Sequence, residues 1–509
     1  MGNDMTASLL IKNVWLADGT SAPLRKCACL TGNDGSIAAV EKEFSACAAE
    51  KVIDGRGLIL APGFIDAHGH SDISALAATE CFSKISQGVT TEICGNCGLS
   101  AFPVTSENRS HLQELYSNYG LEITWGDLKE YKELFLKHHP VMDIFPCCGH
   151  NTLRAAVCGY EEEELSGIQM DKMRALLDRE FCSGAVGLSF GLLYTPGIFA
   201  SQDEIAALMK VAAKHGKVCT AHLRSEGDEL LESVSEMIGL SLESGLKHFH
   251  FSHLKTAGKA NFGKLDKVLE LFEEAQSRGL TVTCDRYPYI ESMTQLSVAL
   301  PGKWKTLDDV TLKKRLDSLE ERKVLIEELR REKDDEYWQR CRLVNVTCPR
   351  FTAFRGRKIT DIPGDATENV VEILAFDPVH AQAAFAGMSE ENMKRIISLP
   401  FCVMGSDGNA LPAESRFGKP HPRSFGAAAR FLRLTLDMGL PLEECISKVS
   451  GKSAGIFGLD NCGVIAPGKV GDLVLFDPDS IDSKADFSSP ERVAEGIVSV
   501  IKKGEIIYN

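Results

Sequence analysis

A short apolar run recurs along the chain, ends each time in a polar residue, and limits the fold more than any other pattern in the sequence. Eight such runs lie at residues 63–68, 89–97, 141–150, 184–189, 217–222, 247–253, 280–287 and 401–407, with helical patterns between them. Most runs are continuously apolar, which is typical of parallel strands buried on both faces. Eight strand–helix units in succession predict an α/β protein with a (β/α)8, TIM-like barrel.

The two ends of the chain carry strand-and-turn segments that do not fit a barrel. We expect residues 1–60 and 458–509 to form one small β-sandwich domain, with the barrel spanning 61–457. Between the seventh and eighth strands lies an insertion, 290–350, that is helical and highly charged. Two compatible interpretations are a solvated helical insertion and a lid over the barrel mouth.

The balance of charged residues restricts the partners of the protein. The 509 residues include 56 Lys and Arg against 71 Asp and Glu, a formal net charge of −15. Such a surface repels phosphate backbones, so we expect no nucleic-acid partner. No segment reaches the ~18 apolar residues of a membrane span, and the 17 scattered cysteines are typical of reduced thiols in a cytoplasmic protein. The composition leaves the oligomeric state open.

Polar residues at the ends of the predicted strands mark a candidate site, because barrel enzymes build their sites at the carboxyl ends of their strands. His68 and His70 end the first run, and side chains two residues apart on a strand share a face, roughly 6.6 Å apart along it. Four further runs end in Cys97, His222, His253 and Asp407. Imidazole and thiolate suit Zn²⁺, which takes three protein ligands in catalytic sites and keeps a position for water.

Two of these residues have alternative interpretations. Cys97 could be a buried structural thiol, but the glycines on both sides permit a tight turn and a close backbone approach. It could also be a nucleophile with a histidine base, in an enzyme that chelators would spare. Asp407 could occupy a turn before Gly408, but beside the histidines we interpret it as a general base and acid for metal-activated water.

Several longer motifs surround these positions. They include PGFIDAHGH at 62–70, SD at 406–407 and GKVGDL at 468–473. These resemble the amidohydrolase superfamily. Closer motifs are GVTT at 88–91, GNCG at 95–98, GHNTLR at 149–154, AHLRSE at 221–226, SHLK at 252–255, DRYPY at 285–289 and HPR at 421–423. Together these resemble the N-acyl-D-amino-acid deacylases (D-aminoacylases), over most of the chain and in the expected order.

The resemblance implies a role for each motif residue. It implies one tightly bound zinc on Cys97, His222 and His253, and a second, weaker site on His68 and His70 with Cys97 bridging. Many superfamily members bridge their metals with a carboxylated lysine at the end of the fourth strand, but here that strand ends in LSFG at 188–191. The resemblance also implies Asp407 as the catalytic carboxylate and a substrate-binding set, namely Lys255, Tyr287, Arg423 and Tyr194.

Three residues depart from the pattern of that family. Gly69 and Ser71 stand where the family often has Thr and Asp, and Arg286 stands where a small or apolar residue is expected. These changes leave the metal chemistry intact and leave the acyl and side-chain specificity open.

The sequence therefore predicts a zinc-dependent enzyme that hydrolyses a small-molecule N-acyl-D-amino acid to a carboxylic acid and a D-amino acid. One alternative is another amidohydrolase reaction, such as hydrolysis of a cyclic amide or deamination. The other is a non-catalytic assembly protein on the same fold, against which the complete set of ligand positions argues.

Overall fold

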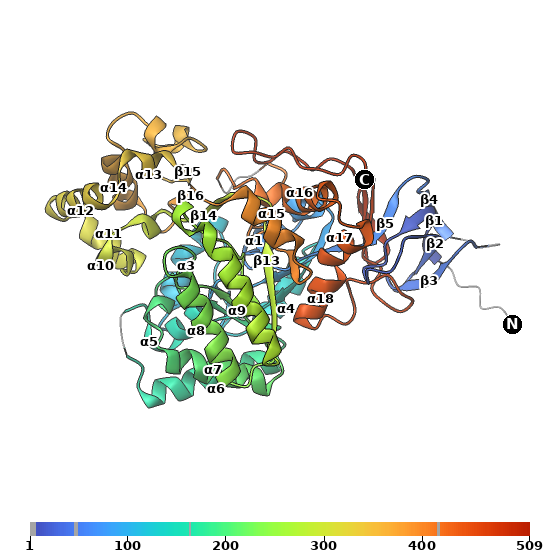
Figure 1. Cartoon of the computed structure of the whole chain (residues 1–509), viewed down its shortest axis with the longest axis horizontal. Coiled ribbons are helices and arrows are strands. Elements are labelled where there is room, and N and C mark those ends of the chain that lie inside the picture. Colours follow the sequence, from blue (N-terminus) through green and yellow to red (C-terminus); the bar gives the residue numbers. More distant parts are fainter. Residues whose placement is uncertain (1–6, 45–48, 162–163, 415–417) are drawn as a thin grey trace.

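Two parallel sheets form the centre of the structure, a computed structural model that describes residues 7–44, 49–161, 164–414 and 418–509 (Figure 1). The first sheet has the order β6 (Phe64–Asp66), β7 (Val89–Cys94) and β8 (Asp143–Pro146). The second has the order β9 (Cys148–Gly149), β10 (Gly187–Gly191), β11 (Val218–His222), β12 (His248–Phe251), β13 (Thr281–Arg286) and β17 (Cys402–Met404). Each predicted run contains or overlaps at least one of these strands, and the predicted α/β class is confirmed.

The two parallel sheets meet on both sides. On one side only Cys147 separates β8 from β9 in the chain. On the other side β6 and β17 run alongside each other, since the Ala67 amide donates to the Met404 carbonyl at 3.0 Å and Gly69 forms a parallel bridge with Gly408. This second contact brings the ends of the first and last parallel strands together.

Helices occupy the segments between the strands and pack their apolar faces inward. They are α1 (Ser74–Ala77), α2 (Phe82–Ile85), α3 (Arg109–Leu115), α4 (Leu128–His138), α5 (His150–Cys158), α6 (Gly167–Cys182), α7 (Gln202–Lys214), α8 (Leu230–Glu243), α9 (Leu265–Ser277), α15 (Glu390–Ser398), α16 (Arg423–Asp437), α17 (Leu442–Lys448) and α18 (Gly451–Phe457). Helix α7 illustrates the local rules: the Ser201 side chain caps its start by accepting from the Glu204 amide, and Ile205, Leu208 and Met209 are buried.

Strands from both ends of the chain form one eight-stranded sheet. They are β1 (Ala7–Leu16), β2 (Arg25–Gly32), β3 (Ile37–Glu41), β4 (Ala49–Asp54), β5 (Ile59–Pro62), β18 (Leu473–Phe476), β19 (Ile497–Lys502) and β20 (Glu505–Tyr508). The two ends join where β5 pairs antiparallel with β18, from Ile59 opposite Phe476 to Pro62 opposite Leu473. Ile11, Leu60 and Leu475 are among the residues of its separate hydrophobic core.

The segment between β13 and β17 is an elaborate insertion. Its helices are α10 (Gly302–Lys305), α11 (Asp309–Leu316), α12 (Leu319–Glu332), α13 (Asp335–Gln339) and α14 (Ala366–Phe376), and it has its own core around Trp304 and Trp338. It also holds a three-stranded antiparallel sheet in the order β14 (Glu291–Gln295), β16 (Gln382–Ala386) and β15 (Cys341–Asn345). The sequence analysis did not anticipate these short strands, because charged helical segments separate them. In Figure 1 the insertion projects from the parallel sheets at the upper left.

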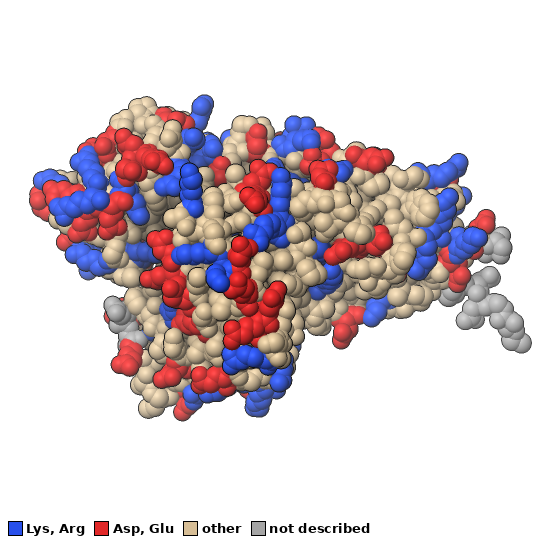
Figure 2. All heavy atoms as spheres, viewed as in Figure 1, with Lys and Arg blue, Asp and Glu red and all other residues tan. Residues whose placement is uncertain are grey.

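On the face shown in Figure 2, acidic and basic side chains are interspersed. The sixteen cysteines within the described ranges are free thiols. No helix in the described part of the chain is long and apolar enough to cross a membrane.

Candidate metal centre and active site

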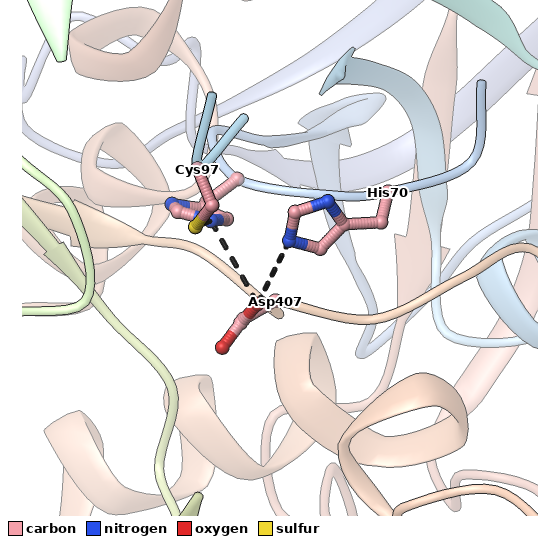
Figure 3. Close-up of side chains that lie close together, drawn as sticks. His70, Cys97 and Asp407 are labelled. Carbon is pink, nitrogen blue, oxygen red and sulfur yellow. Dashed lines mark hydrogen bonds and ion pairs between the residues drawn. The ribbon is translucent and has the colours of Figure 1, made fainter. Parts of the chain in front are cut away.

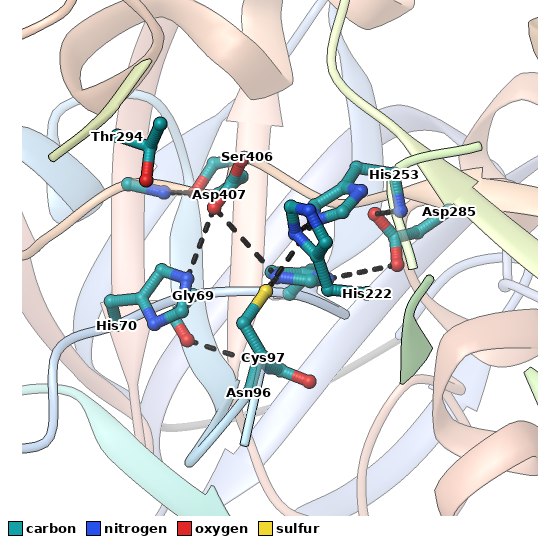
Figure 4. A network of polar contacts seen from close by, with 12 residues as sticks. Gly69, His70, Asn96, Cys97, His222, His253, Asp285, Thr294, Ser406 and Asp407 are labelled. Atoms are coloured by element: carbon teal, nitrogen blue, oxygen red, sulfur yellow. Dashed lines mark hydrogen bonds and ion pairs between the residues drawn. The ribbon is translucent and has the colours of Figure 1, made fainter. Parts of the chain in front are cut away.

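Cys97, His222 and His253 converge on one point at the carboxyl ends of the parallel strands (Figure 4). The Cys97 Sγ atom lies 3.4 Å from His253 Nε2, and His253 Nε2 lies 3.0 Å from His222 Nδ1. All three side chains are buried. Their ligand atoms lie within 4.8 Å of one another, so the three residues that the resemblance assigns to one metal ion do meet in space.

A second group, His68, His70, Cys97 and Asp407, shares Cys97 with the first. His68 Nε2 lies 3.4 Å from Cys97 Sγ, and His70 Nε2 lies 3.0 Å from Asp407 Oδ1. Figure 3 shows Asp407 facing His70 and the Cys97 side chain lying nearby. One thiol therefore lies between two sets of imidazoles, which is the arrangement that a bridging ligand requires.

The chemistry of these donors fits zinc. Although burial raises the pKa of the Cys97 thiol, the imidazoles of His68 and His253 hold it well below its ordinary value. A thiolate with two or three imidazole nitrogens is a ligand set that Zn²⁺ takes, because thiolate and imidazole match its softness. The second group adds a carboxylate oxygen, which zinc also accepts.

Two carboxylates that the sequence analysis did not single out hold the imidazoles in place. Asp285 Oδ2 accepts from His68 Nδ1 at 3.0 Å and from His250 Nε2 at 2.9 Å, and its Oδ1 accepts from the His253 amide at 3.0 Å. Glu226 Oε1 lies 3.0 Å from His253 Nδ1. Such carboxylates fix the tautomer and ring orientation of metal-binding histidines.

These two carboxylates carried a weak signal in the sequence. Both lie inside motifs of the resemblance, DRYPY and AHLRSE, at positions to which no role had been given. Against burial, which raises it, the imidazoles of His68 and His250 keep the pKa of Asp285 well below its usual range. A carboxylate at the end of an apolar strand is itself a reason to expect a charged partner.

Asp407 lies in a loop after β17 with a left-handed backbone, φ 52°. Its Oδ2 lies 2.9 Å from Arg423 Nη1, and its Oδ1 faces His70. Burial raises the pKa of Asp407, but the Arg423 guanidinium and the nearby imidazoles hold it well below its ordinary value. The carboxylate is therefore ionised and able to accept a proton.

The predicted substrate-binding residues face the same cavity, which has a volume of about 730 Å³ and is also lined by His70, Cys97, His222, His253 and Asp407. Lys255 Nζ lies 2.8 Å from His253 Nδ1 and forms an ion pair with Glu226. The Tyr287 hydroxyl is buried and has no hydrogen-bond partner within the described residues. Tyr194 accepts from Thr294 Oγ1 at 3.1 Å, and its hydroxyl lies 3.5 Å from His222 Nδ1.

The surroundings of all three departures from the family pattern are defined. Ser71 Oγ donates to Glu92 Oε2 at 2.8 Å and accepts from the Ala410 amide at 2.7 Å. A Cβ atom on Gly69 would lie 2.0 Å from Glu92 Cδ, so the buried Glu92 side chain occupies the space that a larger residue would need. Arg286 is buried, and its guanidinium lies 4.2 Å from the centre of the Tyr287 ring. His150 pairs with Glu204 at 2.7 Å and belongs to neither group of metal ligands.

Parallel strands whose carboxyl ends carry a His-x-His pair, further imidazoles and a late aspartate define a metal-dependent hydrolase of the amidohydrolase class. The sequence model of a family described as the amidohydrolase family matches residues 359–508 of this chain.

Comparison with known proteins narrows this class. D-aminoacylase from Alcaligenes xylosoxydans xylosoxydans is 30% identical over 502 residues, which cover 98% of this chain and 94% of that protein. N-acyl-D-aspartate deacylase from the same organism is 30% identical over 99% of this chain and 92% of that one. This chain therefore belongs to the D-aminoacylase family of N-acyl-D-amino-acid deacylases.

Solved structures agree with that assignment. N-acyl-D-glutamate deacylase from Bordetella bronchiseptica, in complex with zinc and a phosphonate inhibitor, has a TM-score of 0.83 at 29% identity, covering 99% of this chain and 97% of that chain. A D-aminoacylase with a binuclear metal centre has a TM-score of 0.81 at 30% identity, with coverage of 99% and 97%.

Proposed function

We propose that this chain hydrolyses the amide bond of N-acyl-D-amino acids and releases a carboxylic acid and a D-amino acid. The proposal rests on one observation. Two clusters of imidazoles share Cys97 and lie with Asp407 at one cavity. Near full-length likeness to deacylases of this specificity supports it. Cyclic-amide hydrolysis and deamination lack such support, which here is near full-length similarity at 30% sequence identity.

The metal would be zinc, held tightly by Cys97, His222 and His253, with a second, weaker site at His68 and His70 that shares Cys97. Such an ion would supply Lewis acidity, polarising the substrate carbonyl and lowering the pKa of a water in the site to near 7. Asp285 and Glu226 keep the ring nitrogens of His68 and His253 directed at the ligand positions.

Asp407 would move the proton. Its Oδ1 faces the imidazoles, and its pairing with Arg423 keeps it ionised before the reaction. It accepts a proton from the attacking water and donates that proton to the departing amine nitrogen, which completes one turnover.

The amino-acid carboxylate would bind the cationic side of the cavity. Arg423 and Lys255 supply positive charge, although in this structure they pair with Asp407 and Glu226. Tyr287 also lines the cavity, and its buried hydroxyl has no partner within the described residues and would be a donor for the substrate. Tyr194, beside His222, would line the pocket for the rest of the substrate.

The finer architecture supports this function. We infer that the parallel strands, with β8 and β9 counted as one, close into one (β/α)8 barrel spanning 61–457, since the residues directly after β6 contact β17 and the loop that follows it. Residues 1–60 and 458–509 would form the small β-sandwich, and 290–350 would cover the cavity as a lid, because Leu307, Asp308 and Arg340 line its wall. Free thiols throughout the described chain support a reducing, cytoplasmic setting.

A panel of N-acetyl-D-amino acids and their L-enantiomers, with zinc quantified on the same sample, tests the proposal. Only the D-substrates should release amine. We expect Asp407→Asn to retain zinc and lose ~10²–10⁴-fold in kcat, and Cys97→Ala to lose both zinc and activity. Equal hydrolysis of the two enantiomers, or full activity in metal-free Cys97→Ala, would contradict the proposal.

A further inference from the structure

A fully buried lysine lies directly beneath the loop that carries Asp407. Lys84, on the short helix α2, has no exposed surface. Its Nζ donates to Asp66 Oδ2 at 2.6 Å and lies 2.8 Å from Glu92 Oε2. Although burial lowers the pKa of Lys84, the carboxylates of Asp66 and Glu92 raise it above its ordinary value, so the lysine is charged.

The same ammonium group contacts the residues on both sides of Asp407. It donates to Ser406 Oγ at 2.8 Å and to the Gly408 carbonyl at 3.3 Å. Ser406 Oγ in turn accepts from the Gly408 amide at 3.1 Å. The backbone before and after Asp407 is thus tied to one point, while the Asp407 side chain itself stays free to face the cavity.

Asp66 connects this point to the first pair of histidines. Its Oδ1 accepts from the His68 amide at 3.1 Å and from the Ser406 amide at 2.8 Å. A single Lys84–Asp66 pair therefore fixes the His68 loop and the Asp407 loop against each other. These segments lie more than 300 residues apart in the chain, since the Asp66–Ser406 contact spans 340 positions.

The loop needs such a constraint because Asp407 adopts φ 52°. A non-glycine residue in that region is strained and persists only where its surroundings over-determine it. Helix α2 supplies further contacts to the same loop, since Ser83 Oγ accepts from the Leu411 amide at 2.9 Å. Without Lys84, the loop would lose the two contacts that bracket the strained residue.

We propose that Lys84 is a positioning residue for the reaction, whose ammonium group, with Asp66, holds Asp407 in its left-handed conformation opposite His68 and His70. The inference rests on the proposed function, since Lys84 acts only through Asp407 and contacts no substrate. A misplacement of about 1 Å costs on the order of 10²-fold in rate, so we expect an effect on kcat rather than on KM.

The test variant is Lys84→Met combined with Glu92→Gln, which leaves the net charge of the buried cluster unchanged. Glu92→Gln alone is the reference. Lys448→Met is the matched control, because Lys448 is an equally buried lysine that donates to the Ile397 and Cys402 carbonyls at the opposite end of β17. The control should lose stability and keep the kcat of its folded fraction.

We expect the double variant to bind zinc on Cys97, His222 and His253 as the wild type does, and to lose ~10–100-fold in kcat with KM within ~3-fold. Its crystal structure should show residues 406–408 displaced. In an Asp407→Asn background the same substitutions should cost less than about 2-fold, because the residue they position is already inactive.

A kcat equal to that of Glu92→Gln would overturn the proposal, as would a loss that multiplies with that of Asp407→Asn. If the double variant does not fold, Ser406→Ala carries the same test, since it removes one of the bracketing contacts, and a kcat unchanged by it would overturn the proposal. Wild-type protein without deacylase activity would instead refute the proposed function, and the displaced loop in the crystal structure would still report on Lys84.

Discussion

Asp285→Asn tests whether the buried carboxylate beneath the site sets metal affinity. In the wild type, Asp285 Oδ2 accepts from both His68 Nδ1 and His250 Nε2. His68 therefore carries its proton on Nδ1 and turns the lone pair of Nε2 toward Cys97 and the metal position. Asparagine has the same size but only one side-chain oxygen. If that oxygen still accepts from the His253 amide, the NH₂ group must face the imidazoles of His68 and His250.

That placement puts donor against donor. His68 must then move its proton to Nε2, where it blocks the metal, or the amide must rotate and abandon the His253 amide. Loss of such an outer partner weakens metal binding by about 10–100-fold, which corresponds to roughly 1.4–2.7 kcal/mol. The proposed weaker site, which would use His68, should be affected most, because Glu226 still lies against His253.

Calorimetric titration of the metal-free protein with zinc measures both sites. Glu204→Gln is the matched control, since it breaks another buried carboxylate–imidazole contact, that of Glu204 with His150 at 2.7 Å, without touching a proposed ligand. Zinc affinities in Asp285→Asn equal to wild type at both sites would refute the reasoning. So would an equal weakening in the control.

Two further predictions concern stability. Gly69→Ala would place a Cβ 2.0 Å from Glu92 Cδ, whose carboxylate is held by Lys84 and Ser71. We therefore expect urea unfolding to show a loss of about 1–3 kcal/mol. Gly239→Ala, with open space at its Cβ, should be neutral or stabilising. For Asp309, burial and the neighbouring Asp308 charge raise the pKa to about 6. Because the folded state holds this proton more tightly than the unfolded one, wild-type stability should fall as pH rises from about 4 to 6, and Asp309→Asn should remove on the order of 3 kcal/mol of that fall. Identical pH–stability curves for the two proteins would contradict this.

The parallel strands were predictable because burial on both faces leaves a direct trace in the sequence. The runs at 63–68 and 401–407 are mostly apolar and end in a polar residue, and each contains a buried strand of the structure. The sheet of β14, β15 and β16 left no such trace. Its strands are partly exposed, and they pair across a long helical segment whose own core decides their register.

That the proposed ligands lie close together was predictable, because the ends of parallel strands identify residues that face a common point. What holds those residues was not. Lys84 lies in FSKI at 82–85, where a lysine on a short helix is typical of an exposed surface. Only the pairing of the first parallel strand with the last reveals that the Lys84 ammonium group is enclosed, because that pairing brings Ser406 and Gly408 above helix α2. A residue that faces the cavity can be located from the end of a single strand. A residue that positions it, such as Lys84, can be located only from the packing of distant strands around it. Sequence patterns along one segment therefore identify the first kind far more readily than the second.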